Sequence, residues 1–332
     1  MHEIVVLGGY GRVGQLCVAE LVKSTRARIV VAGRSIQRAE DVAAAHGGRA
    51  RAAYVNAEDR RTLQRALPGS ALVVFCAGAD LLDSLVQAID ACVPFISLTP
   101  STLEPRAAYE LQRRAWTAQV PVVLEAGAVP GLPGVLAELL VRSFPALHEI
   151  RIACTGPWLG SGAALGSQRV RADTGRGDGW LRRPVRWRFS PRIGSRWLRP
   201  SSSGDLAGFV ESHCVERLVY LEPESGPLRR LAKRGPRTRD GGFALAAAAT
   251  VERGTQLLED LVTLEAVDPL EAAAASLGTL AGRVLRGRMP GGFFVPREAL
   301  DPLSYLGQLE KRGVRVSTSL PMVPASAAES LA

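Results

Sequence analysis

A glycine-rich turn near the start of the chain constrains the fold more than any other feature. An apolar run, residues 4–7, leads into Gly9-Tyr10-Gly11-Arg12-Val13-Gly14. A helix-like segment covers residues 15–22, and a second apolar run covers residues 29–32. A lone G-x-G-x-x-G is weak evidence because glycine is common. Here it has a strand before it, a helix after it and a second strand about 20 residues on, which predicts a dinucleotide-binding βαβ unit.

Each glycine of the turn has a distinct physical role. Gly9 allows the tight turn, Gly11 lets the backbone approach a pyrophosphate, and Gly14 lets the helix pack against the strand. The helix N-terminus adds free N–H groups and a partial positive charge. We therefore predict a pyrophosphate site formed by Gly9, Tyr10, Gly11, Arg12, Val13 and Gly14.

The end of the second predicted strand indicates which nucleotide binds. Proteins that bind NAD usually place Asp or Glu there, where it accepts hydrogen bonds from the ribose 2′-OH. This chain has Gly33-Arg34-Ser35 instead, with Arg38 one helical turn beyond Arg34. A guanidinium group and a hydroxyl suit a 2′-phosphate, whereas a carboxylate would repel it. The residues predict NADP(H), and the alternative is that Arg34 is only a solvated loop residue.

The first 125 residues alternate short apolar runs with helix-like segments, which is typical of a parallel α/β sheet. Helical crossovers between six such runs predict a doubly wound Rossmann domain over residues 1–130. The expected strands are residues 4–7, 29–32, 51–55, 71–76, 94–98 and 120–124.

A Gly- and Pro-rich stretch, residues 125–134, marks a change in the pattern. Residues 131–332 predict a second, mixed α/β domain for substrate binding and dimerisation, built on a largely antiparallel sheet. Its C-terminal helix is a candidate to pack back on the Rossmann domain. The expected strands are residues 148–154, 185–189, 217–221 and 243–252, and the expected helices are residues 135–141, 268–285 and 302–312.

The basic charge of the chain is concentrated in one segment. Residues 169–239 contain 17 Arg or Lys and 7 Asp or Glu, whereas the whole chain has a net charge of +9. Three interpretations stay open: a solvated surface, a docking site for an acidic partner, or a nucleic-acid surface with Trp180, Trp187 and Trp197. No nucleic-acid motif accompanies the tryptophans, so we predict no nucleic-acid partner.

Other features bound the location and the chemistry. No apolar run approaches the roughly 20 residues of a membrane helix, and the N-terminus enters a strand at once. The 5 cysteines are scattered without a C-x-x-C pair, and the 4 histidines lack metal-ligand spacing. We predict a cytoplasmic protein with reduced thiols, no metal and no membrane partner.

With these motifs described, the chain resembles the saccharopine dehydrogenase-like reductases over nearly its full length. The resemblance implies an NADP-dependent oxidoreductase with a cleft between its two domains for nicotinamide and substrate. Five stretches carry it: Gly8-Gly9-Tyr10-Gly11-Arg12-Val13-Gly14, Ala32-Gly33-Arg34, Val74-Phe75-Cys76-Ala77-Gly78, Ala126-Gly127-Ala128-Val129-Pro130-Gly131-Leu132-Pro133, and Pro290-Gly291-Gly292-Phe293-Phe294-Val295-Pro296.

One departure from the family bears on the substrate. Family members often have Tyr-x-Asp-Leu where this chain has Phe95-Ile96-Ser97-Leu98, and the missing Asp argues against the usual amino-acid substrates. The chain is also short for the family. Both points favour reduction of a biosynthetic imine, as in the thiazolinyl imine reductases of siderophore assembly, by a homodimer whose substrate is tethered to an acidic carrier protein. The alternatives are a saccharopine-type amino-acid dehydrogenase and a non-catalytic NADP(H)-binding sensor.

Candidate site residues lie where ligands gather, beyond the carboxyl ends of the predicted strands. Hydride transfer to an imine also needs a proton at nitrogen, from a side chain or from water. The Tyr-x-x-x-Lys pair of short-chain dehydrogenases is missing. The candidate proton donors are Tyr220, His213 and Glu125; the plainer alternatives are a core tyrosine, a packed histidine and a carboxylate that caps a turn. The further cofactor contacts that we predict are Cys76, Ala77, Gly78, Thr99 and Gly127.

Overall fold

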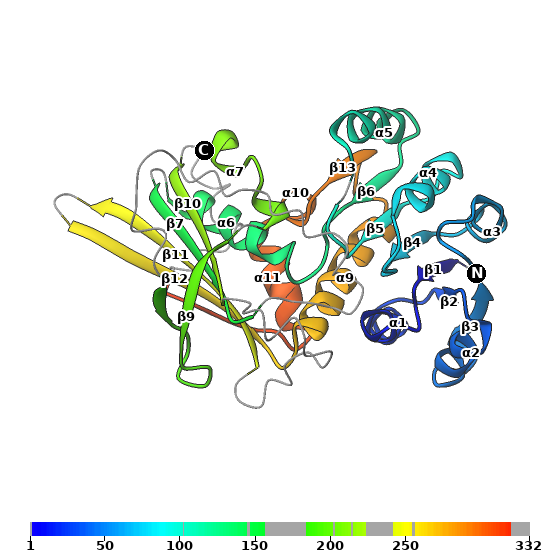
Figure 1. The fold of residues 1–332 in the computed structure, drawn as a ribbon, viewed down its shortest axis with the longest axis horizontal. Coiled ribbons are helices and arrows are strands. Elements are labelled where there is room, and N and C mark those ends of the chain that lie inside the picture. Colours follow the sequence, from blue (N-terminus) through cyan, green and yellow to red (C-terminus); the bar gives the residue numbers. More distant parts are fainter. Residues whose placement is uncertain are drawn as a thin grey trace.

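The computed structural model describes residues 2–101, 103–144, 147–156, 184–201, 203–213, 215–223, 242–253 and 256–319. Two seven-stranded sheets form its framework, and Figure 1 shows them on either side of a layer of helices. None of the helices in these ranges is long and apolar enough to cross a membrane.

The first sheet is parallel throughout, with the order β13-β6-β5-β4-β1-β2-β3. The order from β3 to β6 is that of a doubly wound nucleotide-binding sheet, so the predicted Rossmann fold is confirmed. Its strands are β1 (Glu3–Leu7), β2 (Arg28–Gly33), β3 (Ala50–Tyr54), β4 (Leu72–Phe75), β5 (Phe95–Ser97), β6 (Pro121–Val123) and β13 (Gly292–Phe294).

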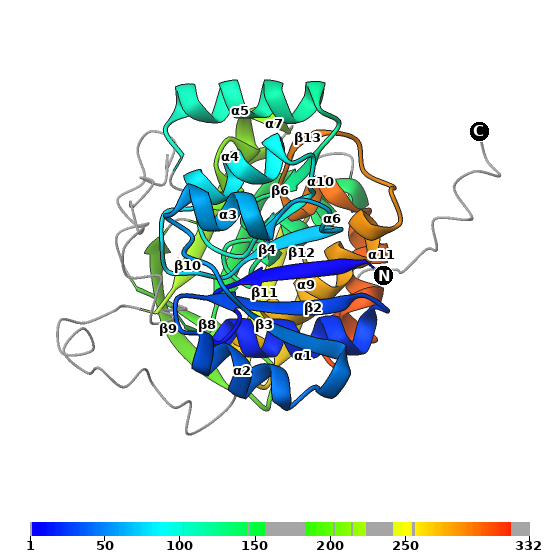
Figure 2. The ribbon, with the colours of Figure 1, turned by 90° about the vertical axis from the view of Figure 1, so that its right-hand side faces the viewer.

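Helices cover both faces of this sheet, as Figure 2 shows from the side of the first domain. The central strands are buried on both faces, which is why they read as continuous apolar runs. In β1, Ile4 and Val6 face the core formed with α1 and α2, whereas Val5 and Leu7 face the core formed with α3, α4 and α5. The helices are α1 (Arg12–Ser24), α2 (Ile36–Ala44), α3 (Arg60–Ala66), α4 (Leu82–Asp90) and α5 (Pro105–Thr117).

The second sheet has the order β14-β12-β11-β7-β10-β9-β8. Only β7 and β10 pair in parallel, so the prediction of a largely antiparallel sheet is confirmed. Three of its strands, β9, β12 and β14, were not predicted. The strands are β7 (Leu147–Cys154), β8 (Val185–Arg188), β9 (Ser195–Ser201), β10 (Val215–Glu222), β11 (Phe243–Arg253), β12 (Gln256–Ala266) and β14 (Arg315–Thr318).

Helices between the sheets join the two parts into one core. Apolar residues of β1, α1, β7 and β11 belong to the same buried cluster, together with those of α6, α9 and α11. Arg312, just beyond α11, donates a hydrogen bond from Nε to Glu20 Oε1 on α1 at 2.9 Å. The helices are α6 (Leu132–Ser143), α7 (Phe209–Ser212), α9 (Pro269–Leu285), α10 (Pro296–Ala299) and α11 (Pro302–Glu310), with 3-10 turns at Gly47–Arg49 and Gly204–Leu206.

The late part of the chain also completes the first sheet. Strand β13 pairs with β6, so residues 292–294 lie at the edge of the nucleotide-binding sheet. Helix α9 packs against α1. The division of the chain at residue 130 stays a prediction, as does homodimer formation.

Candidate active site

The glycine-rich turn has the geometry that a pyrophosphate site requires. Gly11 is the N-cap of α1, so no side chain caps the first N–H groups of the helix. The first turn of α1 also holds no acidic residue. The first N–H groups of α1 therefore stay available to an anion. A Cβ atom on Gly14 would lie 2.2 Å from the carbonyl oxygen of Gly8, so only glycine allows this helix to approach the strand.

Tyr10 connects this turn to the end of β2. A Cβ atom on Gly33 would lie 2.3 Å from the Tyr10 ring, so the tyrosine packs directly on the glycine backbone. The Tyr10 hydroxyl accepts a hydrogen bond from the Ser35 N–H at 3.2 Å, and the Arg38 guanidinium lies 4.6 Å from the ring centroid. Arg34 and Arg38 are both exposed at this end of β2. This arrangement fits a ribose carrying a 2′-phosphate.

The loops after β1, β4, β5 and β6 lie side by side at the carboxyl ends of their strands. A Cβ atom on Gly8 would lie 2.9 Å from Ala77 Cα, and one on Gly127 would lie 2.9 Å from the Leu98 carbonyl oxygen. Ser97 stands at the position where members of the family that the chain resembles often have Asp. Its Oγ is 2.9 Å from Thr99 Oγ1. The structure therefore places the predicted contacts Cys76, Ala77, Gly78, Thr99 and Gly127 at one edge of the sheet.

The predicted cofactor site has two halves, which lie side by side along this edge of the sheet. Arg34 follows β2, so the adenosine half belongs to β1, β2 and β3. The nicotinamide half then belongs to β4, β5 and β6. Glu125, two residues after β6, is the predicted proton donor that lies in this second half.

Glu125 is held in a conformation that few residues adopt. Its φ is 57°, in the left-handed region, and its side chain is buried with 7% exposure. Ser101 N–H donates to its Oε1 at 3.1 Å. Gly204 lies against the carboxylate, because a Cβ atom there would be 2.6 Å from Oε1. Burial, and then the charge of Asp205, raise the pKa of Glu125 to about 7, against the opposing effects of the Ser101 N–H and Arg297.

Asp205 is a site residue that sequence analysis did not select. It is 2% exposed and accepts a hydrogen bond on Oδ2 from the Gly134 N–H at 2.6 Å. Ser203 Oγ donates to its other carboxylate oxygen, and Arg297 Nη1 donates to its backbone carbonyl. Asp205 therefore caps the N-terminus of α6 from 71 residues away in the chain.

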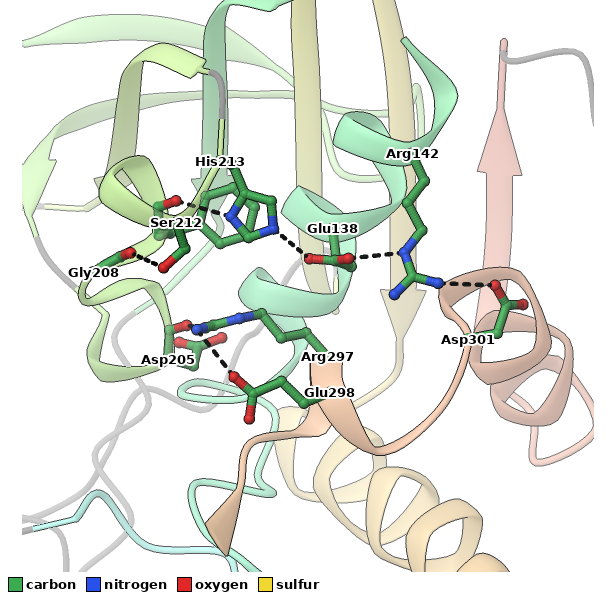
Figure 3. A network of polar contacts seen from close by, with 10 residues as sticks. Glu138, Arg142, Asp205, Gly208, Ser212, His213, Arg297, Glu298 and Asp301 are labelled. Atoms are coloured by element: carbon green, nitrogen blue, oxygen red, sulfur yellow. Dashed lines mark hydrogen bonds and ion pairs between the residues drawn. The ribbon is translucent and has the colours of Figure 1, made fainter. Parts of the chain in front are cut away.

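His213 lies in a network that joins α7, α6 and α11 (Figure 3). Its Nδ1 is 2.9 Å from the Phe209 carbonyl oxygen, and its Nε2 is 3.1 Å from Glu138 Oε2. Arg142 Nε is 2.8 Å from Glu138 Oε1, and its Nη1 is 3.5 Å from Asp301 Oδ1. Both ring nitrogens of His213 thus face acceptors, an arrangement that anchors the segment carrying Asp205.

Tyr220 lies in β10 with 3% exposure, on the face of the second sheet that packs toward α6. Its hydroxyl lies near the Cys154 thiol and has no hydrogen-bond partner among the described residues. Burial holds the pKa of Tyr220 well above its ordinary value. The structure therefore does not bring the three candidate donors together, and the proton-donor assignments stay predictions.

Comparisons with known proteins agree with this fold. The family model of the saccharopine dehydrogenase NADP binding domain matches residues 4–120. The structure is similar to saccharopine dehydrogenase (L-Glu forming) from Saccharomyces cerevisiae, with a TM-score of 0.69 and 13% identity over 96% of this chain and 100% of that chain. It also matches a myo-inositol dehydrogenase from Corynebacterium glutamicum, with a TM-score of 0.47 and 16% identity over 97% and 99% of the two chains. No curated protein matches the sequence.

The nucleotide site and its family match define an oxidoreductase that depends on a nicotinamide cofactor, and that cofactor is NADP. Residues 4–120 of this chain are similar to the NADP-binding domain of the saccharopine dehydrogenases. The likeness to the yeast enzyme adds that the second domain has the same fold.

Proposed function

We propose that the protein reduces the C=N bond of a small-molecule imine in a biosynthetic pathway, with Glu125 as the proton donor. The observation that supports this most is the position and state of Glu125. It follows β6, where we expect the nicotinamide half of the site, and its pKa of about 7 keeps much of the carboxyl group protonated at neutral pH. An acid of this pKa suits proton donation near neutral pH.

The glycine-rich turn and Arg34 would hold the cofactor, and bound NADPH would supply a hydride to the imine carbon. The π electron pair of the C=N bond moves to nitrogen, which takes the proton of the Glu125 carboxyl group. Solvent then returns a proton to Glu125, and the product is an amine. Ser101 N–H and the backbone of Gly204 hold the carboxyl group in place during this transfer.

The substrate that we favour is a thiazoline ring on a carrier-bound siderophore intermediate. Ser97 supports this choice over an amino-acid substrate, because its short, buried side chain binds Thr99 and offers no carboxylate at the position where the family often has one. A saccharopine-type amino-acid dehydrogenase is the alternative enzyme, and a non-catalytic NADP(H)-binding sensor is the alternative from another class. The burial and raised pKa of Glu125 favour an enzyme, because perturbed pKa values cluster at functional sites.

A substrate comparison tests the proposed reaction. The protein with NADPH is expected to consume NADPH in the presence of thiazolines or other imines, with one amine formed per NADPH. Saccharopine with NADP⁺ is expected to give no turnover. Turnover of saccharopine alone would support the amino-acid dehydrogenase, and NADPH binding without turnover of any substrate would support the sensor.

Exposed arginines on β8 bear on the proposed carrier protein. Arg186 and Arg188 point to solvent on the edge strand of the second sheet, and the exposed Trp197 pairs with Arg186 in register. Part of the basic segment, including Arg182, Arg183 and Trp180, lies outside the described residues. An acidic carrier would be attracted to this edge, because opposite charges on two partners steer them together.

Replacing Arg186 and Arg188 by glutamine is expected to lower kcat/KM for a carrier-bound imine by about tenfold, and to leave kcat/KM for the free imine unchanged. The reason is that steering acts on the acidic carrier and not on the small substrate. The matched control replaces the exposed Arg61 and Arg113 of the first domain by glutamine. Equal losses on both substrates in the Arg186/Arg188 variant would contradict a docking role.

A further inference from the structure

Two buried carboxyl groups lie where the segment after β9 packs on the end of β6. Glu125 is 7% exposed and Asp205 is 2% exposed. Gly204, the residue before Asp205, lies directly on the Glu125 carboxylate, since a Cβ atom there would be 2.6 Å from Oε1 and 2.9 Å from Oε2. Both groups are buried in the same part of the molecule, and the charge of one disfavours the charge of the other. Ionising both groups is therefore costly, so one of them carries a proton over a wider pH range.

The hydrogen-bond donors around the two groups are unequal. Burial raises the pKa of Asp205, but the Ser203 hydroxyl, the Gly134 N–H and the Gly131 N–H oppose this effect and favour its charged form. Its carboxylate also lies at the N-terminus of α6, where the helix dipole favours an anion. Among the described residues, Glu125 receives one backbone N–H, that of Ser101. The negative charge therefore belongs on Asp205 and the proton on Glu125.

We propose that Asp205 is a positioning residue that, as a fixed anion at the N-terminus of α6, keeps the neighbouring Glu125 carboxyl group protonated. The protonated group is the form that the proposed reduction requires, and in this respect the inference rests on the proposed function. The two side chains then act as a pair with separate tasks: Asp205 holds charge, and Glu125 holds the transferable proton.

The other charged groups near Glu125 do not cancel the effect of Asp205 on the Glu125 pKa. Arg297 of α10 donates to the Asp205 carbonyl and lies 5.5 Å from the Phe209 ring centroid, and its charge opposes that of Asp205. Glu298 is 3.6 Å from the Arg297 guanidinium and offsets part of that opposition. Tyr220 of β10 is buried and neutral, so it adds no charge. Burial and Asp205 together outweigh Arg297 and the Ser101 N–H, since the pKa of Glu125 is raised.

The test is a direct titration of Glu125 in the NADP⁺-bound protein. Infrared spectra report the C=O stretch of a protonated carboxyl group, and subtraction of the Glu125→Gln spectrum isolates the Glu125 band. Replacing Asp205 by asparagine is expected to move the titration midpoint of Glu125 down by about one pH unit or more, since a like charge is removed. The alkaline limb of kcat/KM for the imine is expected to move by the same amount.

Two further variants make the test specific. Asp301→Asn is the matched control, because Asp301 also caps a helix, through the Ser304 N–H at 2.9 Å, and belongs to the network of Figure 3. It is expected to leave the Glu125 midpoint unchanged. Asp205→Ser removes the same charge as Asp205→Asn but keeps a capping oxygen, so it serves if the asparagine variant does not fold.

The outcomes separate this inference from the proposed function. An unchanged Glu125 midpoint in a folded Asp205 variant would overturn the role of Asp205, whatever the enzyme reduces. A lowered midpoint would support that role even if no imine were turned over, in which case the proposed function alone would fail. A midpoint that Asp301→Asn lowers equally would show general loosening of the fold and overturn the inference.

Discussion

Glu125→Gln is expected to lower kcat for imine reduction by about 100-fold or more, because general acid catalysis contributes roughly 10² to 10⁴ in rate. The amide has nearly the shape of the carboxyl group and can still accept from the Ser101 N–H. It has no proton of suitable acidity to give. In the parent protein the rate should fall as pH rises above about 7, where Glu125 loses its proton. This alkaline limb should be absent from the residual activity of the variant.

Glu125→Gln is expected to lower activity but to raise stability relative to the parent protein as pH increases. The pKa of Glu125 is raised from 4.5 to about 7 in the folded protein, so the folded state binds more protons than the unfolded state between these values. The contribution of this group to folding is therefore favourable below pH 4.5 and is lost as pH rises through 7. Glu125→Gln should thus gain in thermal stability relative to the parent as pH is raised from about 4.5 to 8.

Glu20→Gln provides the control for both measurements. Glu20 is another largely buried glutamate, 12% exposed at its side chain, but it pairs with Arg312 beside α9 and not with the groups around Glu125. Its replacement is expected to lower stability without changing the alkaline limb. Parental kcat in folded Glu125→Gln would show that the proton comes from another group or from water.

Arg34→Asp is expected to change the ratio of NADPH to NADH affinity by about 100-fold, in favour of NADH. The substitution removes a charge-assisted bond to the 2′-phosphate, worth roughly 1.5–3 kcal/mol, and adds a carboxylate that repels the phosphate. A carboxylate at this position also suits the ribose 2′-OH of NADH. Dissociation constants for both nucleotides, measured by titration of the protein without substrate, check this result.

The matched control is Arg26→Asp. Arg26 is an exposed arginine just before β2, at the opposite end of the strand from Arg34. The same charge change there is expected to leave the ratio of affinities as it is in the parent. If the parent bound NADPH and NADH equally, Arg34 would be a solvated loop residue and not a phosphate ligand.

The first domain was predictable because its signals are local. Central parallel strands are buried on both faces and give short apolar runs, and each of the six expected runs became a strand of the first sheet. The second sheet was harder. The sequence of β12 includes Glu259, Asp260 and Glu265 and does not alternate regularly between apolar and polar residues. The strand nevertheless pairs with β11 along its full length. Pairing with β11, the strand just before it, and with β14, and not its own pattern, makes it a strand.

Part of the candidate site was predictable for the same reason. The glycines, Arg34 and Glu125 follow strands, so their place at one edge of the sheet could be inferred from the strand pattern. Asp205 had no such signal. Its role depends on two N–H groups at the start of α6 and on a glutamate 80 positions earlier in the chain. The structure shows that Asp205 caps the start of α6, a role that its own neighbours in the chain do not indicate.

Strand β13 has a consequence for any attempt to dissect this protein. A fragment that ended near residue 130 would keep every residue expected to touch the nucleotide. It would nevertheless expose the N–H and C=O groups of β6 that now bind β13, and the apolar side of α1 that now rests on α9. Such a fragment is a template for edge-to-edge aggregation. A C-terminal deletion that removed β13 would therefore register in an assay as lost cofactor binding, although the deleted residues lie outside the predicted nucleotide contacts.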